Sequence, residues 1–122
     1  MKKWLIAFVA AMLALGIVVL PISHAAKQTK QKTVTVLIKK GAFEPKSLTI
    51  KANTKVTFKN VDTEEHWPAS NDHPTHKLYP QFDAKKGIPA GKSWSFVFKK
   101  VGTWGYHDHW NPSVKAEMMV TK

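Results

Sequence analysis

Beyond residue 33, apolar and polar residues alternate with a period of two, and no stretch has the 3.6-residue period of an amphipathic helix. The alternation recurs in short runs at 34–38, 48–51, 56–59, 94–99, 104–106 and 118–120. Turn residues separate these runs, among them Gly41, Asn53 and Gly102. Many short strands at this spacing predict an all-β sandwich or barrel.

The segment 62–87 departs from this pattern. It contains three prolines and three of the six histidines of the chain, His66, His73 and His76. An irregular loop of this length inside a compact domain is usually functional. We therefore expect the functional site to involve this segment.

The first residues are typical of an export signal. Two lysines are followed by an apolar run at 4–20, and Ser23 and Ala25 supply the small side chains that signal peptidase requires. The sequence therefore predicts a signal peptide at 1–25, cleaved after Ala25, and a periplasmic or extracellular protein. If it is not cleaved, the apolar run anchors the chain in a membrane.

The remaining chain divides into a polar lead and one domain. Residues 26–33 predict a flexible lead, and 34–122 a single folded unit. Cleavage removes two lysines and lowers the net charge from +11 to +9. We expect no nucleic-acid partner, because the protein is exported and its lysines alternate along predicted strands. The charge suits an acidic redox or metal-transfer protein, or an anionic membrane surface.

The chain has no cysteine. This excludes a disulfide scaffold, a thiolate zinc finger, an iron–sulfur cluster and a thiol nucleophile. Any bound metal ion must therefore be held by histidine, carboxylate, carbonyl or methionine ligands.

Five histidines lie close together in two parts of the predicted domain. His66, His73 and His76 belong to the long loop, and His107 and His109 lie two residues apart near the end of a predicted strand. Side chains two apart on a strand point the same way. Three or four converging imidazoles form a complete set of ligands for Cu, Zn, Ni or Fe.

The alternation leaves the direction of these side chains open. If Trp104 and Tyr106 face the core, Asp108 faces it too, and His107 and His109 face outward. Three arrangements follow. Asp108 is an inward ligand, or a bulge at the strand end re-aims the histidines, or the site lies on the outer face together with the histidines of the long loop.

The order of motifs over residues 34–121 resembles the cupredoxins, small copper-binding Greek-key β-sandwiches. The motif at 41–50 is similar to the family's opening strand pair, and 56–62 to the strand that leads to its first histidine ligand, here His66. The runs at 89–98 and 102–106 are similar to the approach to its ligand loop. The resemblance implies an all-β Greek-key sandwich with its site at the loop end.

The ligand loop differs from the family pattern. Counted from Tyr106, the family's cysteine position holds Asp108, and the positions of its second histidine and methionine hold Asn111 and Val114. Of the four usual ligands, the resemblance leaves only His66. A blue copper centre requires a thiolate, so the resemblance implies the fold and the place of the site but a different metal chemistry.

Two motifs resemble multicopper oxidases. The triplet His107-Asp108-His109 is similar to their His-Cys-His with aspartate in place of cysteine, and the motif that begins at His73 and ends at His76 is similar to their His-Pro-x-His. A complete oxidase is not expected from one domain. We predict a metal site with His66, His76, His107 and His109 as ligands, His73 next, and Asp108 as a ligand or as the acceptor that orients an imidazole.

The function predicted from these features is an exported copper protein that handles copper or transfers electrons slowly. Loss of the soft ligands favours Cu(II), while imidazole also accepts Zn or Fe. An enzyme is not the favoured reading, since Glu64 and Glu65 beside His66 resemble ordinary solvated loop carboxylates. The alternative is a metal-free binding module that uses the loop aromatics Trp67, Trp104 and Trp110, and convergence of the imidazoles distinguishes the two.

Overall fold

Each alternating run of the sequence forms a strand. The structure, a computed structural model, describes residues 16–21 and 30–122. Within these residues there are eight strands and no helix. They are β1 (Thr33–Lys39), β2 (Ala42–Glu44), β3 (Ser47–Lys51), β4 (Thr54–Asn60), β5 (Pro68–Ser70), β6 (Ser93–Phe98), β7 (Gly102–Asp108) and β8 (Asn111–Thr121).

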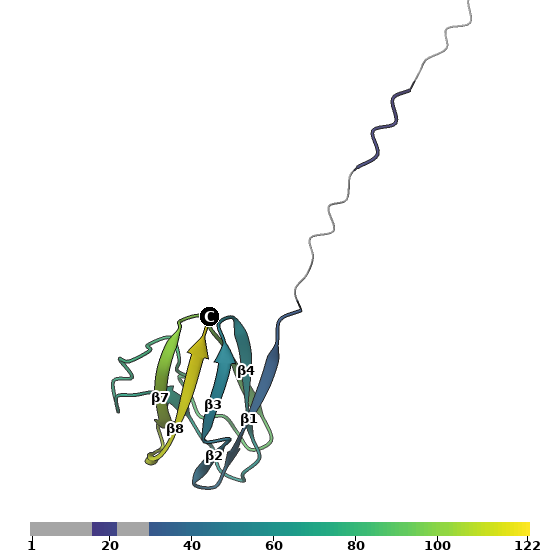
Figure 1. Ribbon diagram of the computed structural model, residues 1–122. Helices are drawn as coiled ribbons and strands as arrows, with labels where there is room; N and C mark the ends of the chain where they lie inside the picture. The colour runs from purple at the N-terminus through teal and green to yellow at the C-terminus, as the bar shows by residue number, and fades with distance from the viewer. Residues whose placement is uncertain (1–15, 22–29) are drawn as a thin grey trace, which may run out of the picture.

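The strands form two four-stranded sheets, which confirms the predicted all-β sandwich. One sheet has the order β2-β1-β4-β6 and the other the order β3-β8-β7-β5. β1 runs parallel to β4 and β3 parallel to β8, while the other neighbours are antiparallel. Figure 1 shows β8 between β3 and β7. Consecutive strands often lie in different sheets, so the chain crosses repeatedly between the two layers.

Aromatic side chains fill much of the space between the sheets. Phe58 of β4 and Tyr106 of β7 are almost completely buried, and their ring centroids lie 5.7 Å apart. Phe82 is also fully buried and lies 5.1 Å from Tyr106. Burial of such large apolar surfaces is the main favourable contribution to folding here.

The long segment between β4 and β6 is anchored in this core. Tyr79, Phe82 and Ile88 are buried, although they belong to no long strand. Ser70 reinforces the anchor, because its hydroxyl donates to the Tyr79 carbonyl at 2.9 Å. The segment therefore has a fixed path along the sandwich, from Asp108 at the end of β7 to Trp104 near its start.

Most of the predicted signal peptide lies outside the described residues, as does the lead up to residue 29. In the described parts of the chain, no helix has the length and apolarity needed to cross a bilayer.

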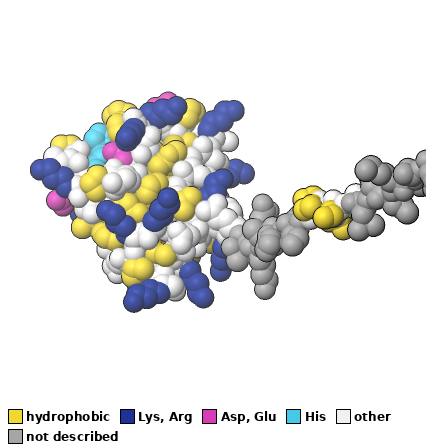
Figure 2. All heavy atoms as spheres, turned by 90° about the horizontal axis from the view of Figure 1, so that it is seen from above, with side chains coloured by type: hydrophobic (Ala, Val, Ile, Leu, Met, Phe, Trp, Pro, Cys, Tyr) yellow, Lys and Arg dark blue, Asp and Glu magenta, His cyan; other side chains and the backbone are white. Residues whose placement is uncertain are grey.

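Figure 2 shows lysine side chains spread over the viewed face rather than gathered in one patch. This agrees with the sequence, in which the lysines alternate along the predicted strands.

Candidate metal centre

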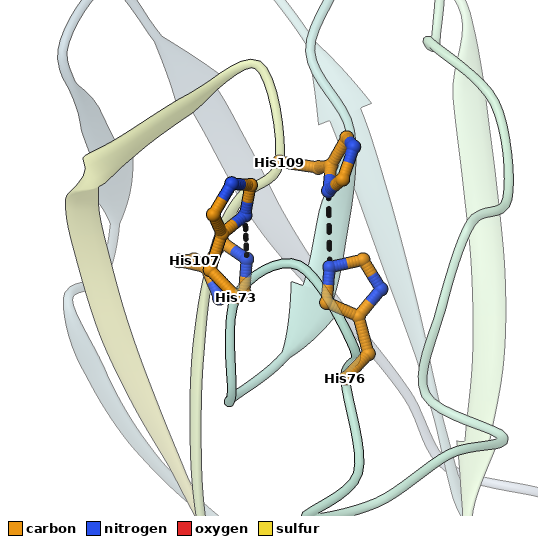
Figure 3. A group of neighbouring side chains, drawn as sticks. All are labelled: His73, His76, His107 and His109. Atoms are coloured by element: carbon orange, nitrogen blue, oxygen red, sulfur yellow. Dashed lines mark hydrogen bonds between the residues drawn. The ribbon is translucent and has the colours of Figure 1, made fainter.

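Four histidines converge at one end of the sandwich. His73 and His76 come from the segment after β5, His107 from β7, and His109 from the turn between β7 and β8 (Figure 3). One ring nitrogen from each lies within 4.8 Å of the others. His76 and His107 are buried, His109 is half-buried and His73 is exposed. The group therefore has a buried side and a side open to solvent.

The pairing of β7 with its neighbours puts this group on the outer face of the sheet. Tyr106 pairs with Ala116, and both point into the core. His107 is the next residue and pairs with the exposed Lys115, so it points to the opposite face. Of the three arrangements that the sequence left open, the structure has the outer-face one. The β7–β8 register does shift between His107 and Asp108, but His107 itself still pairs in register.

The segment after β5 folds back over that face. β5 is antiparallel to β7 and ends beside Tyr106. The backbone N–H of Asn71 then donates to the Gly105 carbonyl at 3.0 Å. Gly105 leaves room for this return, because a Cβ there would lie 2.7 Å from the Asn71 side-chain nitrogen. The backbone N–H of His76 donates to the Asp72 carbonyl, and the turn that this bond closes brings His76 back to the group.

Two polar side chains hold two of the rings in place. His107 donates its Nδ1–H to Asn71 Oδ1 at 2.9 Å, and His76 donates its Nδ1–H to Asp83 Oδ2 at 2.9 Å. Both bonds leave Nε2 of the ring as the atom that faces the group. Metal-ligating histidines commonly donate their second N–H to a carboxylate or carbonyl oxygen in this way.

Asp83 also ties the group to an aromatic wall. Its other oxygen accepts the indole N–H of Trp67 at 2.7 Å. The Trp67 ring packs on His109 with centroids 4.3 Å apart, and Trp110 lies 5.3 Å from Trp67. The Asp83 carboxylate therefore fixes both His76, which is a candidate ligand, and the Trp67 ring, which covers the candidate ligand His109.

The spacing of the nitrogens fits a single metal ion. His73 Nδ1 lies 3.3 Å from His107 Nε2, and His109 Nδ1 lies 3.1 Å from His76 Nε2. Metal–nitrogen bonds of about 2.0 Å place two ligand nitrogens on one ion at most about 4 Å apart. The largest separation in the group can reach 4.8 Å, which exceeds this limit by about 1 Å, so a closure of that size brings all four nitrogens within reach of one ion.

The surroundings keep two of these rings neutral. Burial, and next the charge that His76 and His73 carry when protonated, lower the pKa of His107 to about 4. The same two causes lower the pKa of His109. Asp83 is affected by burial, which raises its pKa, but bonds from Trp67 and His76 lower that pKa overall. Neutral imidazole beside a carboxylate is the state that binds a cation.

His66 lies outside this group. Its Nδ1 contacts Asp108 Oδ2 at 2.6 Å and its Nε2 contacts Asp62 Oδ2 at 2.8 Å. Burial by itself lowers the pKa of His66, but these two bonds outweigh burial and raise it, and the bond from His66 lowers the pKa of Asp62. Each nitrogen of His66 thus faces a carboxylate, and His66 is not among the four converging histidines.

Asp108 is likewise engaged away from the four histidines. Its Oδ1 accepts the backbone N–H of Trp67 at 2.9 Å and that of Trp110 at 3.0 Å, while Oδ2 binds His66. Of the six predicted site residues, the structure thus brings together His73, His76, His107 and His109. It places His66 and Asp108 in a separate ion pair on the other face of β7.

Sequence reasoning missed Asn71 and Asp83. Neither belongs to a motif, and the only signal was their place in the histidine-rich loop, where an amide or carboxylate is available to orient a ring. The three tryptophans of the alternative prediction do not form one surface. Trp104 packs on Tyr79 at the start of β7, whereas Trp67 and Trp110 lie near its other end.

Comparison with known proteins adds a family and a set of similar structures. The family described as cupredoxin-like domain matches residues 11–120. No curated protein sequence matches the chain.

Similar solved structures include a mutant of amicyanin in its reduced state, with 21% sequence identity and a TM-score of 0.64 over 73% of this chain and 82% of that one. The purple cupredoxin from Nitrosopumilus maritimus has 22% identity and a TM-score of 0.63 over 72% and 99% of the two chains. The Cu(I) form of another amicyanin mutant has 21% identity and a TM-score of 0.64 over 75% and 84%. At these identities the likeness is one of fold.

Because Asp108 accepts hydrogen bonds from Trp67, Trp110 and His66, its removal is expected to lower the stability of the fold strongly. Asp108→Ala leaves two backbone N–H groups and the His66 imidazolium without their acceptor, so we expect the free energy of unfolding to fall by about 3 kcal/mol or more. Asp108→Asn keeps an oxygen for the N–H groups and should recover part of this loss. Urea unfolding followed by tryptophan fluorescence measures both, and equal losses in the two variants would contradict this role.

The burial of His107 predicts an unusual titration. In the metal-free protein we expect the His107 imidazole to take up its second proton with a midpoint of about 4. In the unfolded chain the same imidazole titrates near 6.5. Because the unfolded state binds the proton more readily, stability should be lost as the pH falls from about 6.5 towards 4. NMR measures the midpoint, and His107→Gln should remove this part of the pH dependence. A midpoint near 6.5 would contradict the expectation.

Proposed function

Because the chain belongs to the cupredoxin-like domain family, we propose that it is an exported copper-binding protein whose ion is held by His73, His76, His107 and His109. The observation that carries this proposal is the convergence of four imidazole nitrogens within 4.8 Å of one another. Two of the rings have their second nitrogen bonded to an oxygen that orients them. This is a cation site assembled before the cation arrives.

Copper is the ion that this set of ligands favours. Among divalent first-row ions, a site of nitrogen ligands binds Cu(II) most tightly. The set contains no sulfur, so Cu(I) gains less from it than from a thiolate site, and no thiolate-to-copper charge-transfer band is expected. Zn(II) and Fe(II) are the competitors, because imidazole also accepts them.

Copper handling is the role that we propose for this site, in preference to electron transfer. His73 is exposed while His76 and His107 are buried, so the ion has one accessible ligand through which it can be exchanged. The net positive charge of the chain suits an acidic metal-transfer or redox partner or an anionic membrane surface. Slow electron transfer is the second role, since a site without soft ligands stabilises the oxidised ion.

Export is part of the proposal and has its own test. Cleavage after Ala25 removes the apolar run and releases the domain into the periplasm or the medium. Sequencing the amino terminus of the protein recovered from outside the cytoplasm should begin at Ala26. Recovery of the uncleaved chain from the membrane fraction would show instead that the run is an anchor.

Loading with Cu(II) tests the metal site directly. We expect one equivalent of tightly bound copper, a paramagnetic spectrum with nitrogen hyperfine structure, and only weak ligand-field absorption. His76→Gln, His107→Gln and His109→Gln should each weaken binding at least about tenfold, because each removes one of four ligands. Zn(II) in competition measures the preference for copper.

The matched control is His66→Gln, which changes a neighbouring histidine that the structure places outside the group. It should retain the copper affinity and the spectrum. An intense thiolate-like band, or the absence of stoichiometric metal, would overturn the proposal, and loss of copper in His66→Gln alone would move the site to the other face of β7.

A further inference from the structure

A cavity lies directly beside the four histidines. It has a volume of about 190 Å³. Its walls are Asn71, Asp72, His73, His107, Pro112 and Lys115. Two of the proposed ligands, His73 and His107, are therefore part of the cavity wall, so a molecule bound there lies close to the proposed ion.

Two hydrogen-bond donors line the same cavity. Lys115 is exposed on β8 and stands opposite His107 in the strand register, so its side chain is on the face that carries the histidines. Asn71 accepts the His107 N–H with its side-chain oxygen, which leaves its NH2 group as the donor. Among the described residues that NH2 group has no protein acceptor within hydrogen-bonding distance.

The charges around the cavity select the kind of ligand. An ion held by four neutral imidazoles keeps its full double positive charge, and Lys115 adds another positive charge beside it. The Asp72 carboxylate at the wall of the cavity repels anions and disfavours those with several charges. A singly charged anion is attracted by the ion and Lys115 and is less repelled by Asp72 than an anion with several charges. If it has two oxygens, it can accept hydrogen bonds from both Lys115 and Asn71.

We propose that the cavity binds a carboxylate group, held by Lys115 and Asn71 beside the metal ion. This inference rests on the proposed metal site, because the ion supplies much of the attraction. A carboxylate oxygen is also an ordinary ligand for Cu(II) and Zn(II), so the group in the cavity approaches the ion through a chemically suitable atom.

The carboxylate has two potential sources, a small organic acid or an acidic side chain of a metal-transfer partner. A second cavity of about 370 Å³ adjoins the first and shares Asn71 and Lys115 with it. Lys46, Gly105 and Glu117 are also among its lining residues. This continuous surface leaves room for the chain that carries an acidic side chain, in addition to the group itself.

The test uses the Zn(II)-loaded protein, because Zn(II) is diamagnetic, after metal analysis of the same sample. Acetate is added at constant ionic strength while NMR follows the backbone amides of Asn71 and Lys115. We expect shifts that saturate, and we expect Lys115→Gln to raise the dissociation constant for acetate about tenfold. The matched control is Lys59→Gln, which removes the same charge from β4 in the other sheet and should leave the constant unchanged.

A short acidic peptide and its glutamine counterpart distinguish the two sources. If the carboxylate belongs to a partner, the acidic peptide saturates the shifts at a lower concentration than acetate, and the glutamine peptide does not bind. If it belongs to a free acid, peptide and acetate act alike for each carboxylate. Either result supports the carboxylate site.

The inference is overturned if metal is bound but acetate and peptide leave the spectrum unchanged, or if Lys115→Gln and Lys59→Gln weaken binding equally, which indicates a general charge effect. A sample that holds no metal overturns the proposed function and this inference together. The metal analysis therefore separates the two failures.

Discussion

The carboxylate of Asp108 is the contact on which the arrangement of the site depends. It accepts the backbone N–H of Trp67 before β5 and that of Trp110 after β7, and it pairs with the His66 imidazole. The His109 N–H adds a bond to the Trp67 carbonyl at 2.7 Å. These contacts fix the end of β7 to the start of β5, so the segments that carry all four clustered histidines begin from fixed points.

The two faces of β7 have taken different roles. On the inner face, His66 and Asp108 meet, and the His66 imidazole lies between the carboxylates of Asp108 and Asp62. Because each nitrogen of His66 faces a carboxylate, that position holds a structural ion pair. On the outer face, His107 and the returning segment after β5 form the group proposed to bind copper. The proposed metal site therefore lies on the opposite face of β7 from this ion pair.

Much of the fold was predictable because period-two burial is a local property. The strands around Val36, Phe58 and Tyr106 follow directly from alternation, and the structure confirms the all-β sandwich. Alternation by itself did not predict the short strands β2 and β5, since three residues carry too little pattern. The resemblance did imply a strand pair at 41–50, where the structure has β2 and β3. The burial of Tyr79 and Phe82 was also not predicted, because it depends on how a long irregular segment packs against both sheets.

The sequence by itself determined that no thiolate is present and that any metal must rely largely on imidazole, because composition fixes the available donor atoms. It left the direction of His107 open, because a bulge at the end of the strand would re-aim the side chain, and the pairing of His107 with Lys115 settled it. Only the tertiary structure decided which rings meet. His73 and His76 join His107 and His109, and His66 does not, because the return of the chain over Gly105 and the carboxylates around His66 are contacts between residues far apart in sequence.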